Sequence, residues 1–271
     1  MKKILFLLSI FMFITACEEL NNSNNIDYTN YIGESSIITD IDFYPRELYE
    51  NSNVIDTPVL KLYFITATGF ACINYSISIS SFFEDNELIL RFDSITQSDV
   101  CLTAAGPASA YMDLPENIES LILINGNSID RYQLEITDEK VIINSLDTSF
   151  SNLKYSTIFR YPENTFVYEC SMDTSETNMY YDFLEILTDN LSITEYNFTG
   201  QGMEPYAENW TENNRESLTK YFQYENEIEF DKAGELLYDF VIENSVNENT
   251  SVYISLISWN NQKYLSWMMP D

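Results

Sequence analysis

The chain has 271 residues, of which 45% are hydrophobic and 15% aromatic, a composition typical of a packed core and not of disorder. Its 43 acidic residues outnumber 13 basic residues, and the resulting net charge of −30 argues against binding to nucleic-acid backbones. The chain contains no histidine, which removes Ser-His-Asp and Cys-His catalysis and the commonest zinc ligand. We therefore predict no cofactor and no metal site.

The first residues have the pattern of a secretory signal. Lys2 and Lys3 precede the apolar run Ile4–Ile14, whose eleven residues are fewer than the roughly 20 that a membrane-spanning helix needs. Small residues and then Cys17 follow, which is the order found at a signal-peptide cleavage site. Residues 1–16 are therefore predicted to be a signal peptide.

The stretch Ile14-Thr15-Ala16-Cys17 resembles the lipobox of bacterial lipoproteins. The resemblance implies cleavage before Cys17, a diacylglyceryl thioether on its sulfur and an acyl chain on its new amine. Several acyl chains hold a protein on a membrane durably, whereas one chain does so only marginally. The alternative is an ordinary signal peptide that happens to end near a cysteine. Under the family's sorting rule, Glu18 in place of aspartate favours the outer membrane, on its periplasmic or its surface face.

Residues 17–34 are polar and unpatterned, and we predict that they form a flexible tether. Residues 35–146 read as short strands separated by turns, which is typical of a β-sandwich, here of immunoglobulin-like topology. Within this part, the runs 73–83 and 88–92 predict a hairpin, and Asn125-Gly126 predicts a second tight turn. The polar stretch 147–152 is the predicted boundary to a C-terminal domain.

Residues 153–271 mix strand and helix patterns. Met179, Phe183 and Leu187 fall on one helical face, which predicts a first helix. A second helix would begin near Asp231 as its cap, although the alternation over 236–243 also suits a strand. With two helices the order is β-α-β-β-α-β plus a strand, which is ferredoxin-like, and the alternative is a second mostly-β domain. The chain is thus predicted to be mostly β with an α+β C-terminal part.

Three cysteines remain after Cys17 in an oxidising compartment, where disulfides are expected. Cys72 and Cys101 lie in the same predicted domain at strand edges, and we predict that they pair. Such a bridge would stabilise by roughly 3–4 kcal/mol, whether it links two sheets or joins a hairpin. Cys170 lies in a predicted strand, Thr165–Cys170, and is predicted to be a buried thiol. A catalytic role is not expected, because no histidine can activate it.

Candidate sites are few. Exposed aromatic rings bind sugars, and Tyr206 and Trp210 lie in a long loop, which makes them the predicted ligand contacts. The other large aromatics of the C-terminal region suit a core better; they are Trp259, Tyr264 and Trp267. Three acidic clusters could attract calcium but lack the EF-hand spacing, and exposed turns explain them as well; they are Asp40 with Asp42, Glu84 with Asp85 and Glu87, and Asp173 with Glu176. We nominate no catalytic residue.

These observations favour a non-catalytic lipoprotein held on the outer membrane, acting as a binding or adhesion module or as an accessory subunit of an envelope complex. Its partners would be the membrane, through its lipid, and a protein or glycan ligand. Two alternatives stay open. One is a structural envelope protein without a ligand of its own, and the other is a hydrolase of extracellular glycans that uses two carboxylates.

Overall fold

The computed structural model describes residues 27–51, 54–98, 100–102, 104–172, 177–206, 216–246 and 252–268. The predicted signal peptide, lipobox and Cys17 lie outside these ranges. The chain separates into two compact units, residues 1–32 and 33–271. In the first unit, a 3-10 helix spans Tyr28–Tyr31, and the Asp27 carboxylate accepts a hydrogen bond from the Thr29 backbone N–H at 3.0 Å.

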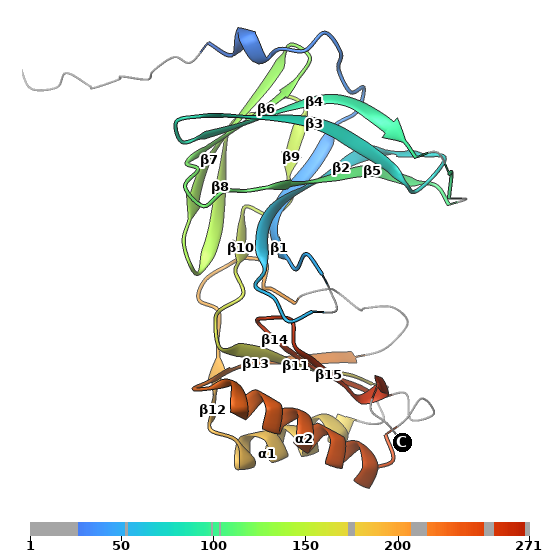
Figure 1. Ribbon diagram of the computed structural model, residues 1–271, viewed down its shortest axis with the longest axis vertical. Coiled ribbons are helices and arrows are strands. Elements are labelled where there is room, and N and C mark those ends of the chain that lie inside the picture. Colours follow the sequence, from blue (N-terminus) through green and yellow to red (C-terminus); the bar gives the residue numbers. More distant parts are fainter. Residues whose placement is uncertain are drawn as a thin grey trace, which may run out of the picture. The chain divides into compact units, whose positions relative to one another are not determined.

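The second unit is mostly β, as predicted, and its strands form one large sheet and one smaller sheet (Figure 1). The strands of the large sheet are β1 (Ile41–Leu48), β2 (Val59–Phe70), β3 (Tyr75–Glu84), β4 (Glu87–Gln97), β5 (Gly106–Asp113), β6 (Ser120–Asn125), β7 (Ser128–Ile136), β8 (Lys140–Asp147), β9 (Ser151–Leu153) and β10 (Thr157–Phe159). Their order across the sheet is β10-β8-β7-β6-β4-β3-β5-β2-β1-β9.

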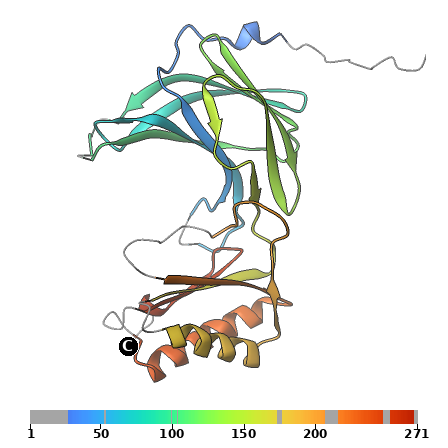
Figure 2. The same ribbon diagram turned by 180° about the vertical axis from the view of Figure 1, so that it is seen from behind.

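The large sheet curls, because the chain steps between its two edges (Figure 2). Strand β8 lies near one edge and β9 forms the other, yet only residues 148–150 connect them. Four Cα–Cα steps span at most about 15 Å, so the two edges lie close together. The chain then returns from β9 to β10 at the first edge through residues 154–156.

Alternation of side chains builds the core inside this curl. In β1 every second residue is buried, and Ile41 and Phe43 are completely inaccessible to solvent. The residues between them face outward, as period-2 alternation requires. The inward residues pack into one cluster that draws on strands from across the whole sheet, with Phe64, Phe92 and Tyr132 among its largest members.

An immunoglobulin-like sandwich has two packed sheets, whereas the strands of residues 35–146 all pair within one sheet. Local pairing was predictable, and the β3–β4 hairpin is confirmed. The closure of the large sheet was not predictable from the sequence. It depends on β9, which pairs in parallel with β1 across more than 100 positions of sequence. Strands β9 and β10, at and beyond the predicted boundary 147–152, belong to the same sheet.

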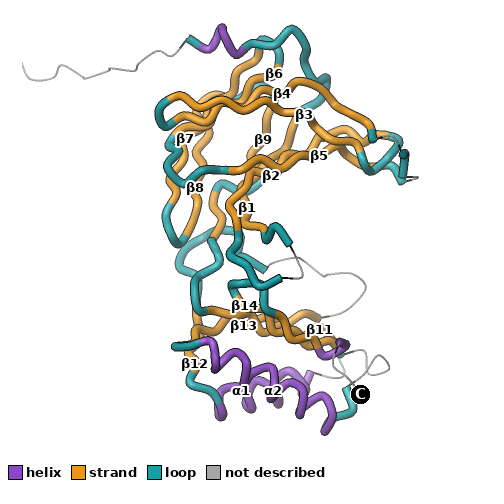
Figure 3. Tube along the Cα trace, in the orientation of Figure 1, coloured by secondary structure: helices purple, strands orange, loops and turns teal. Residues whose placement is uncertain are grey.

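The smaller sheet has the order β12-β13-β11-β14-β15, and all of its pairs are antiparallel. Its strands are β11 (Thr165–Met172), β12 (Ile193–Tyr196), β13 (Glu216–Tyr224), β14 (Tyr253–Ser258) and β15 (Lys263–Leu265). Helices α1 (Thr177–Asn190) and α2 (Glu227–Glu243) cover one of its faces (Figures 1 and 3). Phe166, Tyr168 and Cys170 alternate onto that face and pack with the helices.

The ambiguous stretch 236–243 is helical, within α2. Ala233, Leu237 and Phe240 are buried on its inner face, so the period of 3.6 residues describes this segment and the period of two does not. The prediction that Asp231 caps this helix was wrong. Asn226 caps the helix by accepting a hydrogen bond from the Ile228 N–H at 3.1 Å, and Asp231 instead accepts one from the Tyr264 hydroxyl.

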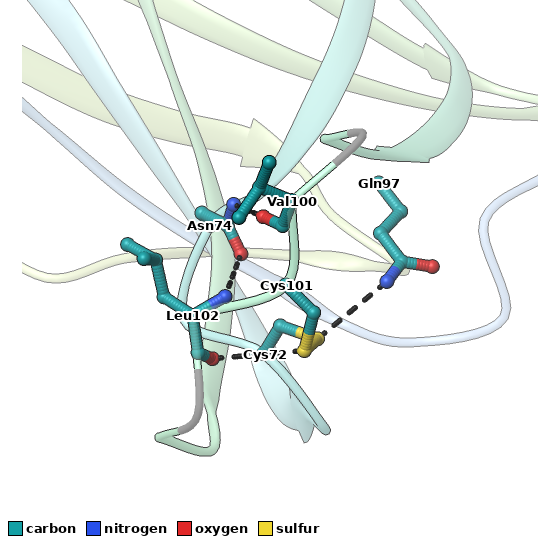
Figure 4. Close-up of a disulfide and its surroundings, with 6 residues drawn as sticks. All are labelled: Cys72, Asn74, Gln97, Val100, Cys101 and Leu102. Atoms are coloured by element: carbon teal, nitrogen blue, oxygen red, sulfur yellow. Dashed lines mark hydrogen bonds between the residues drawn. A yellow bond between two sulfur atoms is a disulfide. The ribbon is translucent and has the colours of Figure 1, made fainter.

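The predicted disulfide between Cys72 and Cys101 is confirmed, with Cα atoms 5.4 Å apart (Figure 4). It joins the β2–β3 loop to the β4–β5 loop within one sheet, so it does not link two sheets. Asn74 braces the same loops, since its amide donates to the Val100 carbonyl at 2.5 Å and its oxygen accepts from the Leu102 N–H at 3.3 Å. Cys170 is a buried free thiol, as predicted.

No helix among the residues that the structure describes is long and apolar enough to cross a membrane.

Candidate functional site

The outer face of the large sheet carries a row of tyrosines. Tyr44 on β1 lies opposite Tyr63 on β2, and Tyr63 lies opposite Tyr111 on β5. Tyr44 and Tyr63 alternate with buried residues, and the neighbours of Tyr111 are partly buried against the same core, so the three tyrosines share the face that turns away from the core. Tyr155, just after β9, extends the row beyond Tyr44. We call these four residues the tyrosine row.

The rings of the tyrosine row contact one another in sequence. The centroids of Tyr63 and Tyr111 are 4.6 Å apart and the rings are stacked. Tyr44 meets Tyr63 edge-on at 5.4 Å and meets Tyr155 edge-on at 5.2 Å. The two ends of the row remain open to solvent, with Tyr111 46% and Tyr155 44% exposed. The row is therefore a continuous aromatic strip that a ligand can reach.

Charged groups flank the row on both sides. On one side the Asp42 carboxylate pairs with the Lys154 ammonium at 2.7 Å and accepts from the Asn152 amide at 3.2 Å. On the other side Lys61 pairs with Asp113 at 2.6 Å. These ion pairs hold their side chains in place beside the rings, with donors and acceptors of hydrogen bonds both available.

Arg46 also flanks the row, in register with Lys61 on the neighbouring strand. Three of the chain's 13 basic residues thus border this strip, although the molecule as a whole is strongly acidic; they are Arg46, Lys61 and Lys154. The local charge balance therefore differs from that of the rest of the surface.

Partial burial among the other rings raises the pKa of Tyr44 above its usual value near 10. Its phenol is therefore neutral at physiological pH and can both donate and accept a hydrogen bond. Flat ring faces between polar groups are the surface that a sugar needs, because one face of a sugar ring presents C–H bonds and its rim presents hydroxyls. The arrangement suits binding.

Of the predicted ligand contacts, Trp210 lies outside the described residues, and Tyr206 is not a member of the tyrosine row. Tyr206 packs edge-on against Tyr161, with centroids 4.4 Å apart, in the wall of a separate pocket. Trp259 and Tyr264 are partly buried against the core beneath α2, which agrees with the core assignment. The core prediction was wrong for Trp267, which is 45% exposed and contacts Tyr253.

Two residues of the predicted acidic clusters have structural roles. Asp42 is held in its ion pair with Lys154, and Asp85 has a positive φ of 53° in the β3–β4 turn. The cluster with Asp173 and Glu176 lies outside the described residues. Across the described part of the chain, no group of three or more His, Cys, Asp or Glu side chains is arranged to hold a metal.

The tyrosine row was missed from the sequence because its members come from four distant segments. The available signal was local: Tyr63 stands between Leu62 and Phe64 in an alternating strand, and Tyr44 directly follows Phe43. That pattern places each tyrosine on an outer face, but it does not say which strands are neighbours.

No protein-family model matches this chain, and no curated protein or solved structure matches it either.

Proposed function

We propose that this protein is a lipid-anchored, non-catalytic binding module of the cell envelope, and that the tyrosine row binds neutral glycans. The observation that carries the proposal is the unbroken strip of four tyrosine rings flanked by fixed charged side chains. Aromatic faces supply packing area at little entropic cost, and a few polar groups supply orientation. A polyanionic glycan would be repelled by a chain of net charge −30.

The anchor is part of this proposal. The lipobox-like stretch ending at Cys17 implies a lipid at the new N-terminus, and residues 18–34 would then lead from the membrane to the folded body. Mass spectrometry of the native N-terminus checks this directly, since we expect a chain that begins at an acylated Cys17. A native chain that retains Met1 would contradict it.

For the C-terminal part, we infer the ferredoxin-like arrangement. Its support is the strand order β12-β13-β11-β14, with one helix after β11 and one after β13. The strand β15 is an addition at one edge. The immunoglobulin-like topology for residues 35–146 has weaker support, because those strands pair within one sheet.

The non-catalytic part of the proposal follows from the chemistry beside the row. Asp42 and Asp113 are each engaged by a lysine at 2.7 and 2.6 Å, so these two carboxylates are already paired, whereas a glycan hydrolase needs two carboxyl groups that both face the scissile bond. The structural alternative, a protein with no ligand, predicts that the row only stabilises the sheet through cross-strand contacts.

Binding of the purified protein to an array of neutral glycans tests the proposal. We expect Tyr111→Ala to weaken binding about fivefold, because it removes a stacking face worth about 1 kcal/mol. Tyr111→Phe keeps the ring and should retain most of the affinity.

The matched control is Tyr238→Ala, which removes a partly exposed tyrosine from α2, far from the row in sequence and on the other sheet's helix layer. It should bind like the wild type. An array without hits, or equal binding by Tyr111→Ala and wild type, would mean that the row is structural.

A further inference from the structure

The tyrosine row ends at a pocket. Tyr155, the last ring of the row, also lines a pocket of about 480 Å³ together with Gln201, Gly202, Met203 and Glu204. Two of those residues, Met203 and Glu204, line a second and smaller pocket of about 290 Å³. The row, the first pocket and the second pocket are thus linked by shared residues.

The segment that separates the two pockets is fixed by backbone pairing. Met203 pairs with β10, since its N–H donates to the Thr157 carbonyl at 2.9 Å and its carbonyl accepts from the Phe159 N–H at 2.8 Å. This close approach requires Gly202, because a Cβ there would lie 2.9 Å from the Phe159 ring. Backbone hydrogen bonds and close packing therefore fix the position of the wall that the two pockets share.

The smaller pocket is lined by tyrosines and by charges of both signs. Tyr49 and Tyr161 lie with their ring centroids 5.4 Å apart, and Tyr206 packs on Tyr161. The charged residues of the lining are Arg46, Glu47, Glu169, Glu204 and Lys263. A pocket with aromatic walls, donors and acceptors suits a polar and uncharged ligand better than an ion of either sign.

The Tyr49 hydroxyl is used by the fold, since it donates to the Trp259 carbonyl at 2.7 Å. The Tyr206 hydroxyl is different. It is buried beside the Tyr49 side chain, with which it interacts, and it makes no hydrogen bond of standard geometry to any residue that the structure describes. Burial raises the pKa of Tyr206 well above its usual value, so this hydroxyl keeps its proton.

A second polar atom of the lining also lacks a partner. Asn261 is only 4% exposed, and its amide nitrogen donates to the carbonyls of Asn51 at 3.2 Å and Val54 at 2.9 Å. These bonds fix the orientation of the amide, and its oxygen accepts no hydrogen bond from the described residues. Leaving a buried polar atom unpaired costs about 1–3 kcal/mol, so two of them in one pocket point to a ligand that pairs with them.

We infer that the smaller pocket binds one sugar unit, the end of the glycan chain whose following units lie on the tyrosine row. This inference rests on the proposed function and adds to it that the protein recognises chain ends. The volume lies at the low end for ligand pockets, which suits a ligand as small as one sugar unit. Sugar hydroxyls donate and accept, so they can satisfy both the Asn261 oxygen and the Tyr206 hydroxyl.

Saturation-transfer NMR with glucose, galactose and N-acetylglucosamine as probes tests the inference on the purified mature protein. We expect at least one of the three to bind, and Tyr206→Phe to weaken that binding about fivefold through loss of one hydrogen bond. Tyr206→Phe should melt at the same temperature as the wild type or higher, because the lost hydroxyl makes no hydrogen bond of standard geometry to the described residues.

Tyr132→Phe is the matched control, because it removes a buried hydroxyl that does have a partner, Ser151, outside the pocket. It should melt lower than the wild type and bind the probe unchanged. Absence of binding by all three sugars would overturn the inference, as would equal binding by Tyr206→Phe and wild type.

Failure of the inference is distinguishable from failure of the proposed function. If glycans bind through Tyr111 but no single sugar binds through Tyr206, the tyrosine row is a glycan site and the smaller pocket is not a sugar site. If a single sugar binds through Tyr206 but Tyr111→Ala binds glycans normally, the smaller pocket is a sugar site and the tyrosine row is not a glycan site.

Discussion

Gly234 destabilises the helix in which it lies but permits close packing of a neighbouring ring. Gly234 lies inside α2, where glycine costs about 1 kcal/mol relative to alanine. A Cβ at this position would lie 2.5 Å from Cε1 and Cζ of Tyr264. The absent side chain therefore admits the Tyr264 ring, whose hydroxyl donates to Asp231 at 2.9 Å.

We predict that Gly234→Ala lowers the free energy of unfolding by about 1–3 kcal/mol, because the clash outweighs the gain in helix propensity. Denaturant unfolding measures this. In a Tyr264→Ala background the same substitution should become neutral or stabilising, since the ring that it strikes is gone. Equal effects in the two backgrounds would show that Tyr264 is not the cause.

At the scale of the elements, the closure of the large sheet depends on one buried carboxylate. Asp130 on β7 is fully buried, and its two oxygens accept from the backbone N–H groups of Ser149 at 2.7 Å, Phe150 at 3.1 Å and Ser151 at 2.8 Å. The Ser149 and Ser151 hydroxyls donate to it as well. These residues form the crossing from β8 to β9, where the two edges of the sheet meet.

We predict that Asp130→Asn lowers the free energy of unfolding by about 2 kcal/mol or more. Either orientation of the amide places an NH₂ group against a backbone N–H donor, so the loss is not only one of charge. Thermal and denaturant unfolding test this, with Asp147→Asn as control. Asp147 is exposed and forms a surface pair with Arg131, so its change should stay within about 0.5 kcal/mol.

On the scale of the whole molecule, buried phenols and one buried thiol make the fold sensitive to alkali. Burial raises the pKa of Tyr132, Tyr180 and Tyr224 to about 12, and raises the pKa of the Cys170 thiol to about 12. Their ordinary values are near 10 and 9. Between those values and 12 the unfolded chain loses protons that the folded chain keeps, so the free energy of unfolding falls as pH rises.

We therefore predict full stability from these groups below about pH 9 and progressive loss between about pH 9 and 12. Circular dichroism followed together with tyrosinate absorbance, at constant ionic strength, measures this. The buried tyrosines should ionise together with unfolding. Ionisation of all tyrosines near pH 10 with an intact dichroism spectrum would contradict the prediction.

Much of the local structure was predictable because it depends on neighbours in sequence. The β3–β4 hairpin and the turn at Gly126, with its positive φ of 59°, follow from short-range patterns. The pairing of Cys72 with Cys101 followed from their shared domain and from strand edges close in sequence. The cap at Asn226 was missed because Asp231, a few residues on, is an equally good cap by residue type.

Composition and the period of the hydrophobic pattern alone determined that this chain is acidic, mostly β and without histidine chemistry. They also determined which face of each strand is apolar. These properties are local or additive, so they do not depend on which strands become neighbours. Only the tertiary structure decided that the strands join into one curled sheet, that four distant tyrosines touch, and that Tyr206 and Asn261 share a pocket. The physical reason is register. Strand partners are chosen by packing across the whole core, and a shift of one residue would turn each tyrosine to the opposite face.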